Sequence, residues 1–521
     1  MLTYYLLFET EEQYSSFSNI PDDPELFDRL NMDIIEEYLC SLSPAFPREF
    51  LRKMNNDVAV AKYRGEVFRE LYKDSAWKSA EELCDQVSSL RSQSDVIKNM
   101  TDPIQRKIVS IHVAAQYFAL LDRICSFVSP FNSSGLRRVL DVFQTYLCAK
   151  DTTDIKDAIY QSEKLLNSYL RVSLTIDRTK KKVTFINPQP EVSASLHNLD
   201  LLCQELTGVS VLQPFTIVDT SSPTLLEKKT LVKILEDHKD LADEIENIPD
   251  VKIKWEQLNL FQSQISFYIA FLRLVEQLKE KNLPFCYADF DNKYRICAND
   301  MYDLSLTIRN INEVDFYQTA NSIDLQADTF GYILTGANQG GKTTFLRSTG
   351  IVTFLSMCGC PVPAKSVVLY PYQTIVTLFS GEEDRKNEES RFELEAKKYC
   401  LCRDRLSSST LVLLNEFFTG TNRLDAVNIL GKCIIELIDK QVSFGCVTHF
   451  QEICETLGDS LNSRIQYLRA GQPVEINGRK KYIIEKGHPD GRAYSERITK
   501  QLEMTYDDLI RQFEERGFCD V

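Results

Sequence analysis

The sequence predicts a multidomain protein in which an all-α region precedes an α/β domain built around a phosphate-binding loop. Three observations predict this fold class. Apolar residues recur at helical spacing from about Asp23 to Lys281, whereas short apolar strands alternate with turns and helices after Pro284. In addition, residues 336–343 match the phosphate-loop pattern G-x-x-x-x-G-K-[ST]. We therefore expect a helical region at 1–283 and an α/β domain at 284–521.

The overall charge argues against a protein that simply coats nucleic acid. The chain has 521 residues with a formal net charge of −15, and its 43% hydrophobic content is ordinary for a soluble globular protein of several domains. An acidic chain has no global basic footprint. Contacts with nucleic acid would have to rest on local patches or on the geometry of a clamp.

Cysteine usage indicates a reducing compartment. The 15 cysteines are scattered, and the only close pairs are the C-x-C pairs Cys358/Cys360 and Cys400/Cys402, neither with a second pair at zinc-site spacing. The apolar start, residues 1–7, has no basic flank and runs into acidic residues, unlike a signal peptide. No apolar run approaches the length of a membrane span. We expect a cytoplasmic protein with reduced cysteines and no membrane segment.

Long amphipathic helices dominate the first half of the chain. Thr101 and Pro103 form a typical helix start, and a long apolar stripe of period 3.6 runs from Leu258 to Val275. We interpret such stripes as helix packing. Their length and narrowness favour levers and struts.

One segment interrupts the helices. Two β-rich runs, 172–176 and 183–186, flank the sequence Asp-Arg-Thr-Lys-Lys-Lys at 177–182. This pattern predicts a β-hairpin with a basic tip. The tip is either a solvated turn or a phosphate contact.

The phosphate loop lies in the expected context of a strand and a helix. The apolar run 332–334 precedes the loop, and a helix with buried apolar residues follows it. Glycines let backbone N–H groups point at phosphate oxygens at the positive end of the helix. The alternative is a glycine-rich turn that matches by chance. The candidate nucleotide-binding residues of the loop are Gly336, Asn338, Gly340, Gly341, Lys342, Thr343 and Thr344.

Lys342 is expected to reach the β- and γ-phosphates, and Thr343 to ligate Mg²⁺. A second apolar strand, 410–414, ends in Asn415 and Glu416, which is the layout of a Walker B segment with asparagine in the aspartate position. Glu416 is then the candidate general base or water-positioning group, and Asn415 the second metal-site residue. The alternative is a buried strand that merely ends in polar residues. Because Asn415 brings no charge, we expect weak Mg²⁺ binding and slow turnover.

A third apolar strand, 442–447, ends in Thr448 and His449. A histidine just past a strand end could face a γ-phosphate, so His449 is a second candidate catalytic residue. A structural histidine remains the alternative.

The C-terminal region resembles the ATPase domain of the MutS family of DNA mismatch-repair proteins. TGANQGGKTT is similar to the family's TGPNMGGKST, NEFFTGTNRLDA (415–426) to its DEIGRGTSTYDG, and Thr448-His449-Phe450 to its T-H-Y. Further similar segments are 320–325, which precedes the loop, the G-x-x-V-P-A stretch at 359–365, the acidic loop from 381, and Ser390-Arg391-Phe392, which resembles S-T-F. The likeness is specific from about Ala320 to Arg497 and loose before Pro284, where 63–69 resembles part of the family's helical core.

The resemblance implies an ABC-type ATPase fold with ATP and Mg²⁺ bound between two facing domains of a homodimer. Ser390 corresponds to the signature serine that reaches the γ-phosphate of the opposite subunit. Asn321 falls in the segment that precedes the loop and is a further candidate nucleotide-binding residue. Long helical levers would carry ATP-dependent closure to a DNA-encircling end.

Three departures from the family shape the functional expectation. The chain begins almost directly with the helical core, so we expect no direct mismatch reading, and the hairpin at 172–186 would be at most a reduced clamp domain. The family's adenine-stacking aromatic falls at Gln318, so stacking would need Phe316 or Tyr317. We expect no nuclease-like domain after the tail helix at 506–516.

Two functions remain open on the sequence alone. The first is an ATP-dependent, dimeric, MutS-like clamp on duplex or branched DNA that acts in repair or recombination. The alternative is a nucleotide-gated scaffold that retains the ATP switch and has lost DNA binding.

Overall fold

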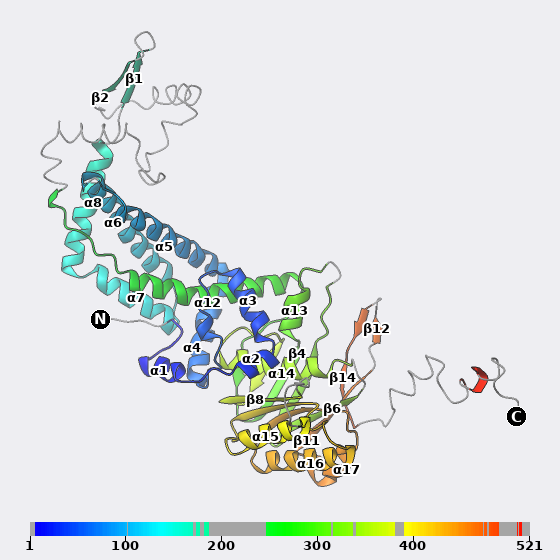
Figure 1. The fold of residues 1–521 in the computed structure, drawn as a ribbon. Coiled ribbons are helices and arrows are strands. Elements are labelled where there is room, and N and C mark those ends of the chain that lie inside the picture. The colour runs from blue at the N-terminus through cyan, green and yellow to red at the C-terminus, as the bar shows by residue number, and fades with distance from the viewer. Residues whose placement is uncertain are drawn as a thin grey trace. The chain divides into compact units, whose positions relative to one another are not determined.

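The computed structural model describes residues 6–101, 103–169, 173–177, 182–186, 246–313, 316–336, 340–380, 390–471, 474–476, 479–488, 508 and 510–512. Helices predominate up to residue 280, and strands alternate with helices after it, as the sequence predicts. Within these residues the chain forms two compact units, each described below by itself (Figure 1).

The compact units differ from the two sequence-defined domains. Unit 1 contains 1–4, 78–132 and 136–262, and unit 2 contains 5–77, 133–135 and 263–521. The N-terminal segment 5–77 therefore groups with the α/β region. A domain boundary at residue 283 stays a prediction, whereas the division by compactness falls inside helix α12.

Unit 1 is built mainly from long helices. Its helices are most of α5 (Ala76–Lys98), α6 (Pro103–Val128), most of α7 (Ser134–Leu147), α8 (Lys150–Tyr169) and the first part of α12 (Trp255–Glu280). Helices α6 and α8 pack together, and polar pairs connect them: Nδ1 of His112 lies 2.9 Å from Oε1 of Glu163, and Lys156 lies 2.7 Å from Asp122. Helix α6 begins at Pro103, as predicted.

The segment Arg106–Val128 of α6 corrects the expectation that no stretch has the length of a membrane span. By length and composition this helix could cross a membrane, with a mean hydropathy of 1.3. Of its most apolar 18-residue window, 61% is buried against the rest of the chain. Burial of this kind is typical of a core helix, so the segment is weak evidence for a membrane span.

The predicted hairpin is present in unit 1. Strands β1 (Ser173–Asp177) and β2 (Lys182–Ile186) pair antiparallel, with Asp177 opposite Lys182. The basic tip between them lies outside the described residues.

Unit 2 contains the second half of α12 together with the N-terminal helices. These are α1 (Glu11–Ser18), α2 (Pro24–Arg29), α3 (Met32–Leu42) and α4 (Val58–Tyr72), with short 3₁₀ turns at Arg48–Phe50 and Lys73–Ser75. Every residue of α12 from Gln264 to Leu272 is buried. This half of α12 is therefore a core helix enclosed on all sides and not a narrowly striped strut.

The centre of the α/β region is a six-stranded sheet in the order β14-β11-β6-β10-β9-β8. The five strands from β11 to β8 are parallel, and β14 is antiparallel to its neighbour β11. Their bounds are β6 (Gly331–Gly336), β8 (Thr374–Phe379), β9 (Thr410–Asn415), β10 (Ser443–Val447), β11 (Ile465–Ala470) and β14 (Ile484–Lys486). Because β6, β10 and β9 are adjacent and parallel, their carboxyl ends meet at one edge of the sheet.

A smaller four-stranded sheet, in the order β3-β7-β4-β5, accompanies the large one. Its strands are β3 (Asp289–Phe290), β4 (Tyr294–Met301), β5 (Asn321–Gln326) and β7 (Ser366–Leu369), and the short helix α13 (Leu304–Asn310) follows β4. A third, two-stranded sheet pairs β12 (Val474–Ile476) with β13 (Arg479–Lys481). Most of the predicted tail helix lies outside the described residues.

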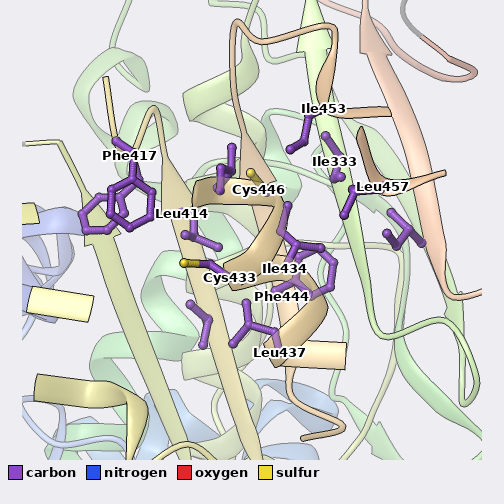
Figure 2. Packing of buried hydrophobic residues seen from close by; sticks show 14 of the residues in the cluster. Ile333, Leu414, Phe417, Cys433, Ile434, Leu437, Phe444, Cys446, Ile453 and Leu457 are labelled. Atoms are coloured by element: carbon purple, nitrogen blue, oxygen red, sulfur yellow. The ribbon is translucent and has the colours of Figure 1, made fainter. Parts of the chain in front are cut away.

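Helices cover the large sheet. Helix α14 (Lys342–Met357) contacts β6, β9 and β10 of the large sheet and β4 of the smaller one, and it is buried along almost its whole length. The remaining helices are α15 (Arg391–Arg403), α16 (Arg423–Asp439), α17 (Ile453–Leu457) and the 3₁₀ turn Asp459–Leu461. Figure 2 shows the core between the sheet and these helices: Ile333, Leu414 and Phe444 face Ile434 and Leu437 of α16. Strands β6, β9 and β10 contribute side chains to this core, and the candidate site lies at their carboxyl ends.

Candidate functional site

Two polar side chains meet where neighbouring strands end. Glu416 follows β9, and His449 follows β10 by two residues. The backbone N–H of Glu416 donates to the carbonyl of Val447 at 2.9 Å, which holds the two chain segments together. Nε2 of His449 lies 2.6 Å from Oε1 of Glu416. The structure thus brings together the two candidate catalytic residues.

The Glu416 carboxylate is kept ionised by its surroundings. A hydrogen bond from His449 lowers the pKa of Glu416 below its usual value, against the opposing effect of burial, and the charges of His449, Lys342 and Arg391 add to this lowering. The backbone of Glu416 has φ 51°, in the left-handed region that side-chain-bearing residues adopt rarely. An unusual backbone angle at a polar strand end is typical of functional positions.

Lys342 begins helix α14 and is buried, with 4% of its surface exposed. Its Nζ donates to the carbonyl of Gly336, the last residue of β6, at 2.8 Å. Burial lowers the pKa of Lys342, and the negative charge of Glu416 acts in the opposite direction. The preceding Gly341 has φ 81°, a conformation that glycine adopts without strain. Asn338 and its two neighbours lie outside the described residues, so the course of the loop itself stays a prediction.

Thr343 and Asn415 are direct neighbours. The Thr343 hydroxyl donates to Oδ1 of Asn415 at 3.2 Å. Both side chains present oxygen atoms, which Mg²⁺ prefers, and Mg²⁺ in nucleotide sites takes few protein ligands because phosphates and waters supply the rest. In the part of the chain that the structure describes, no group of three or more His, Cys, Asp or Glu side chains could hold a metal ion. This pair therefore fits Mg²⁺ that arrives with a nucleotide, but through neutral groups only.

Lys342, Thr343, Glu416 and His449 border a cavity of about 680 Å³. This volume lies within the range of small-molecule sites, about 300–1,000 Å³. The candidate residues from the sequence that line it are Tyr317, Asn321, Gly340, Gly341, Lys342, Thr343, Thr344, Glu416 and His449. The other lining residues are Met301, Leu306, Asn310, Gln318, Thr319, Phe345, Ser348 and Tyr482.

Asn321 has a structural task within this lining. Its Nδ2 donates to the carbonyl of Tyr482 at 3.0 Å, and its Oδ1 accepts from the backbone N–H of Ile484 at 2.8 Å. Asn321 thereby fixes the chain that carries Tyr482. A Cβ added to Gly341 would lie 3.0 Å from Cβ of Tyr482, so this tyrosine sits directly against the start of α14.

Sequence reasoning missed Tyr482. A lone tyrosine between two short strands carries no motif, and only the pairing of β14 with β11 brings it to the cavity. Of the aromatic candidates proposed from the sequence, Tyr317 borders the cavity and Phe316 does not. Gln318 also borders it. Among the described residues, three aromatic side chains thus border the cavity: Tyr317, Tyr482 and Phe345, which is buried in α14.

Ser390 lies elsewhere. It caps the N-terminus of α15, where its Oγ accepts from the backbone N–H of Glu393 at 3.3 Å, and it is exposed. It does not border the cavity in the residues described. Of the candidates that the structure describes, Gly336 and Asn415 also do not border the cavity, but they contact Lys342 and Thr343, which do. Ser390 was expected to act on a second copy.

Comparison with known families agrees with the site. Residues 332–477 match the family model of MutS domain V. This domain is the ATPase domain of the MutS family, which binds nucleotide, so the matched segment is similar to a MutS ATPase domain. The match includes Lys342, Thr343, Asn415, Glu416 and His449 but ends before Tyr482 and begins after Asn321.

Proposed function

We propose that this chain is a MutS-like, ATP-dependent DNA-binding protein that acts in DNA repair or recombination as a dimeric, nucleotide-gated clamp. The observation that carries the proposal is the cavity bordered by Lys342, Thr343 and the Glu416–His449 pair, with Asn415 in contact with Thr343, in a segment similar to MutS domain V. A buried lysine, a hydroxyl and a carboxylate around one cavity suit a nucleoside triphosphate.

Different side chains of this chain bind the phosphates, the base and the metal ion of ATP. Lys342 exchanges its hydrogen bond with the Gly336 carbonyl for the phosphates, and its buried ammonium interacts with them in a site of low dielectric. Tyr317 and Tyr482 offer aromatic faces to the base. Thr343 and Asn415 would hold Mg²⁺, which would neutralise phosphate charge when bound.

Hydrolysis rests on Glu416. Its carboxylate is ionised and orients or deprotonates a water for attack on the γ-phosphate. His449 holds this carboxylate in place through the 2.6 Å contact, and its side chain is 36% exposed and borders the cavity. Because Asn415 contributes no negative charge next to Thr343, turnover is slow.

The second protomer completes the site in this proposal. Ser390 is exposed at the N-terminus of a 13-residue helix, where a hydroxyl and backbone N–H groups favour an anion. Its position outside the cavity of its own chain suits contact with the nucleotide of a partner.

DNA binding is the less directly supported half of the proposal. The helical unit 1 and its β1–β2 hairpin favour a clamp, and the net charge of −15 favours the alternative of a nucleotide-gated scaffold without DNA binding. A clamp that neutralises phosphates releases counterions, so its affinity falls steeply with salt, by a logarithmic slope of about −0.9 for each phosphate contacted.

The test is binding to labelled duplex and branched DNA over a series of salt concentrations, with and without ATP. We expect the parent to bind DNA in a salt-dependent way and ATP to change its affinity for DNA. In Lys342→Ala, which loses nucleotide binding, ATP should leave the affinity for DNA unchanged. Binding that is absent at low salt in every nucleotide state contradicts the clamp and supports the scaffold.

A further inference from the structure

A cation at the start of α15 contacts the segment that follows Glu416. Arg391 directly follows Ser390, and its Nη2 donates to the Thr419 hydroxyl at 2.8 Å and to the Ser380 hydroxyl. Its Nε donates to Oε1 of Glu395 at 3.3 Å. One guanidinium therefore links the N-terminus of α15, the end of β8 and the chain after β9.

The carboxylate that holds Arg391 is buried. Glu395 is 3% exposed, and its Oε1 also accepts from Ser380 at 2.9 Å. Its Oε2 is buried without a hydrogen-bond partner among the described residues. A buried carboxylate is costly unless it is paired, so Glu395 favours a guanidinium at position 391 over a neutral side chain.

The contact continues from Thr419 to Glu416. The Thr419 hydroxyl donates to the carbonyl of Glu416 at 3.1 Å. Glu416 and Phe418 both have positive φ, 51° and 64°, so the short turn 416–420 depends on such contacts to keep its shape. A Cβ on Gly420 would lie 2.7 Å from the backbone nitrogen of Phe392, which shows how closely the turn meets the start of α15.

The two motifs that meet here differ from the family pattern in a matched way. Position 391 is Arg in this chain and Thr in the motif S-T-F, whereas position 419 is Thr here and Arg in DEIGRGT. The two side chains are in direct contact. An exchange of arginine and threonine between contacting positions preserves one guanidinium and one hydroxyl at this junction.

We propose that Arg391 is a positioning residue that couples the start of α15, where Ser390 lies, to the turn that holds Glu416. This inference rests on the proposed ATP hydrolysis. Arg391 acts through Thr419 and sets the position of the Glu416 carboxylate against the nucleotide. Displacement of Ser390 by a partner's nucleotide is transmitted along this path to the hydrolytic group of its own chain.

The test compares steady-state ATP hydrolysis and equilibrium ATP binding in the parent, Arg391→Met, Arg391→Lys and Thr419→Val. Misplacing a reacting group by about 1 Å can lower a rate by about 100-fold. We expect a fall in kcat of up to about that size in Arg391→Met, with the affinity for ATP unchanged and with a smaller loss in Arg391→Lys. Arg403→Met is the matched control, because Arg403 lies on the same helix and pairs with Glu436 at 2.7 Å, outside the cavity.

Two double variants isolate the path. Arg391→Met combined with Thr419→Val should lower kcat no further than the larger single effect, since both remove one contact. The exchange Arg391→Thr with Thr419→Arg should recover activity above that of Arg391→Thr alone. The melting temperatures of all variants verify that they fold. If the changes in melting temperature of the two single variants do not add up in the double variant, this gives a second measure of the contact between Arg391 and Thr419.

Additive losses, or a kcat in Arg391→Met equal to that of Arg403→Met, overturn the coupling while leaving the ATPase proposal intact. A parent protein that binds ATP without hydrolysing it overturns the positioning role together with the proposed hydrolysis. A loss of ATP affinity in Arg391→Met with unchanged kcat also contradicts positioning, because it assigns Arg391 to nucleotide binding.

Discussion

Replacing Asn415 with aspartate places a negative charge next to the candidate metal site without changing the size of the side chain. Oδ1 of Asn415 accepts from the Thr343 hydroxyl at 3.2 Å, and an aspartate oxygen in the same position would keep that bond. The change therefore isolates charge from geometry. We expect Mg²⁺ to strengthen nucleotide binding more in Asn415→Asp than in the parent.

The size of the expected gain in Mg²⁺-dependent affinity follows from the kind of hydrogen bond that residue 415 makes. A neutral hydrogen bond contributes about 0.5–1.5 kcal/mol, and one to a charged group contributes about 1.5–3 kcal/mol. If Asn415 holds the metal through a bound water, the change from amide to carboxylate adds about 1.4 kcal/mol, which is about tenfold in affinity.

The assay measures the dissociation constant for ATP with saturating Mg²⁺ and with EDTA. The ratio of the two constants should change about tenfold in Asn415→Asp relative to the parent. Asn428→Asp is the control, because it adds the same charge at an exposed position of α16 away from the cavity. Equal ratios in Asn415→Asp and the control would show that Asn415 does not face the metal.

Three further predictions concern the base, the carboxylate and the fold. Tyr482→Ala removes a ring worth about 1–3 kcal/mol in base stacking, so the dissociation constant for ATP should rise roughly 5- to 150-fold in a titration, and an unchanged constant would exclude base contact. His449→Asn removes the hydrogen bond that lowers the pKa of Glu416. The carboxylate then protonates at a higher pH, so the acid limb of the kcat/KM profile should shift to higher pH, and an unshifted limb would count against the pair. Gly445→Ala places a methyl group 2.6 Å from the ring of Tyr332 in the sheet, which should lower the free energy of unfolding by about 1–3 kcal/mol in urea titrations. An unchanged midpoint would mean that the ring moves aside freely.

Features encoded in short, continuous stretches could be predicted from the sequence. Lys342 and Thr343 follow a glycine-rich loop, so their place at the start of a helix needed no knowledge of distant contacts. Glu416 and His449 each follow an apolar strand, and the parallel pairing of β9 with β10 brings them within 2.6 Å. Lys342, Thr343, Glu416 and His449 border one cavity in the structure, and their roles in nucleotide binding and hydrolysis stay predictions.

Features that depend on what covers an element could not be predicted. The stripe in α12 identified its apolar face, but the same spacing occurs in exposed and in enclosed helices, so its complete burial from Gln264 to Leu272 was missed. The N-terminal run Leu6-Leu7-Phe8 is fully buried in unit 2, where Tyr268 and Gln264 hydrogen-bond to the backbone of Leu6. No local sequence pattern predicts that residues 6–8 pack against α12.

A third group of features also could not be predicted. In these, the role of a side chain depends on contact between segments that are distant in the sequence. Asn321 was a candidate for nucleotide binding, and the structure shows its amide committed to the backbone around Tyr482. Arg391 and Thr419 are 28 positions apart, and neither has a spacing that predicts their contact. The contact between Arg391 and Thr419 depends on the conformation of the turn 416–420, which the sequence does not predict.

The central claim is that the cavity is an ATP site in which Glu416 performs hydrolysis. The most direct test measures ATP binding and single-turnover hydrolysis side by side in the parent, Lys342→Ala and Glu416→Gln. The account predicts that Lys342→Ala loses binding, whereas Glu416→Gln binds ATP as tightly as the parent and does not turn it over. Hydrolysis by Glu416→Gln at the parent's rate would contradict it.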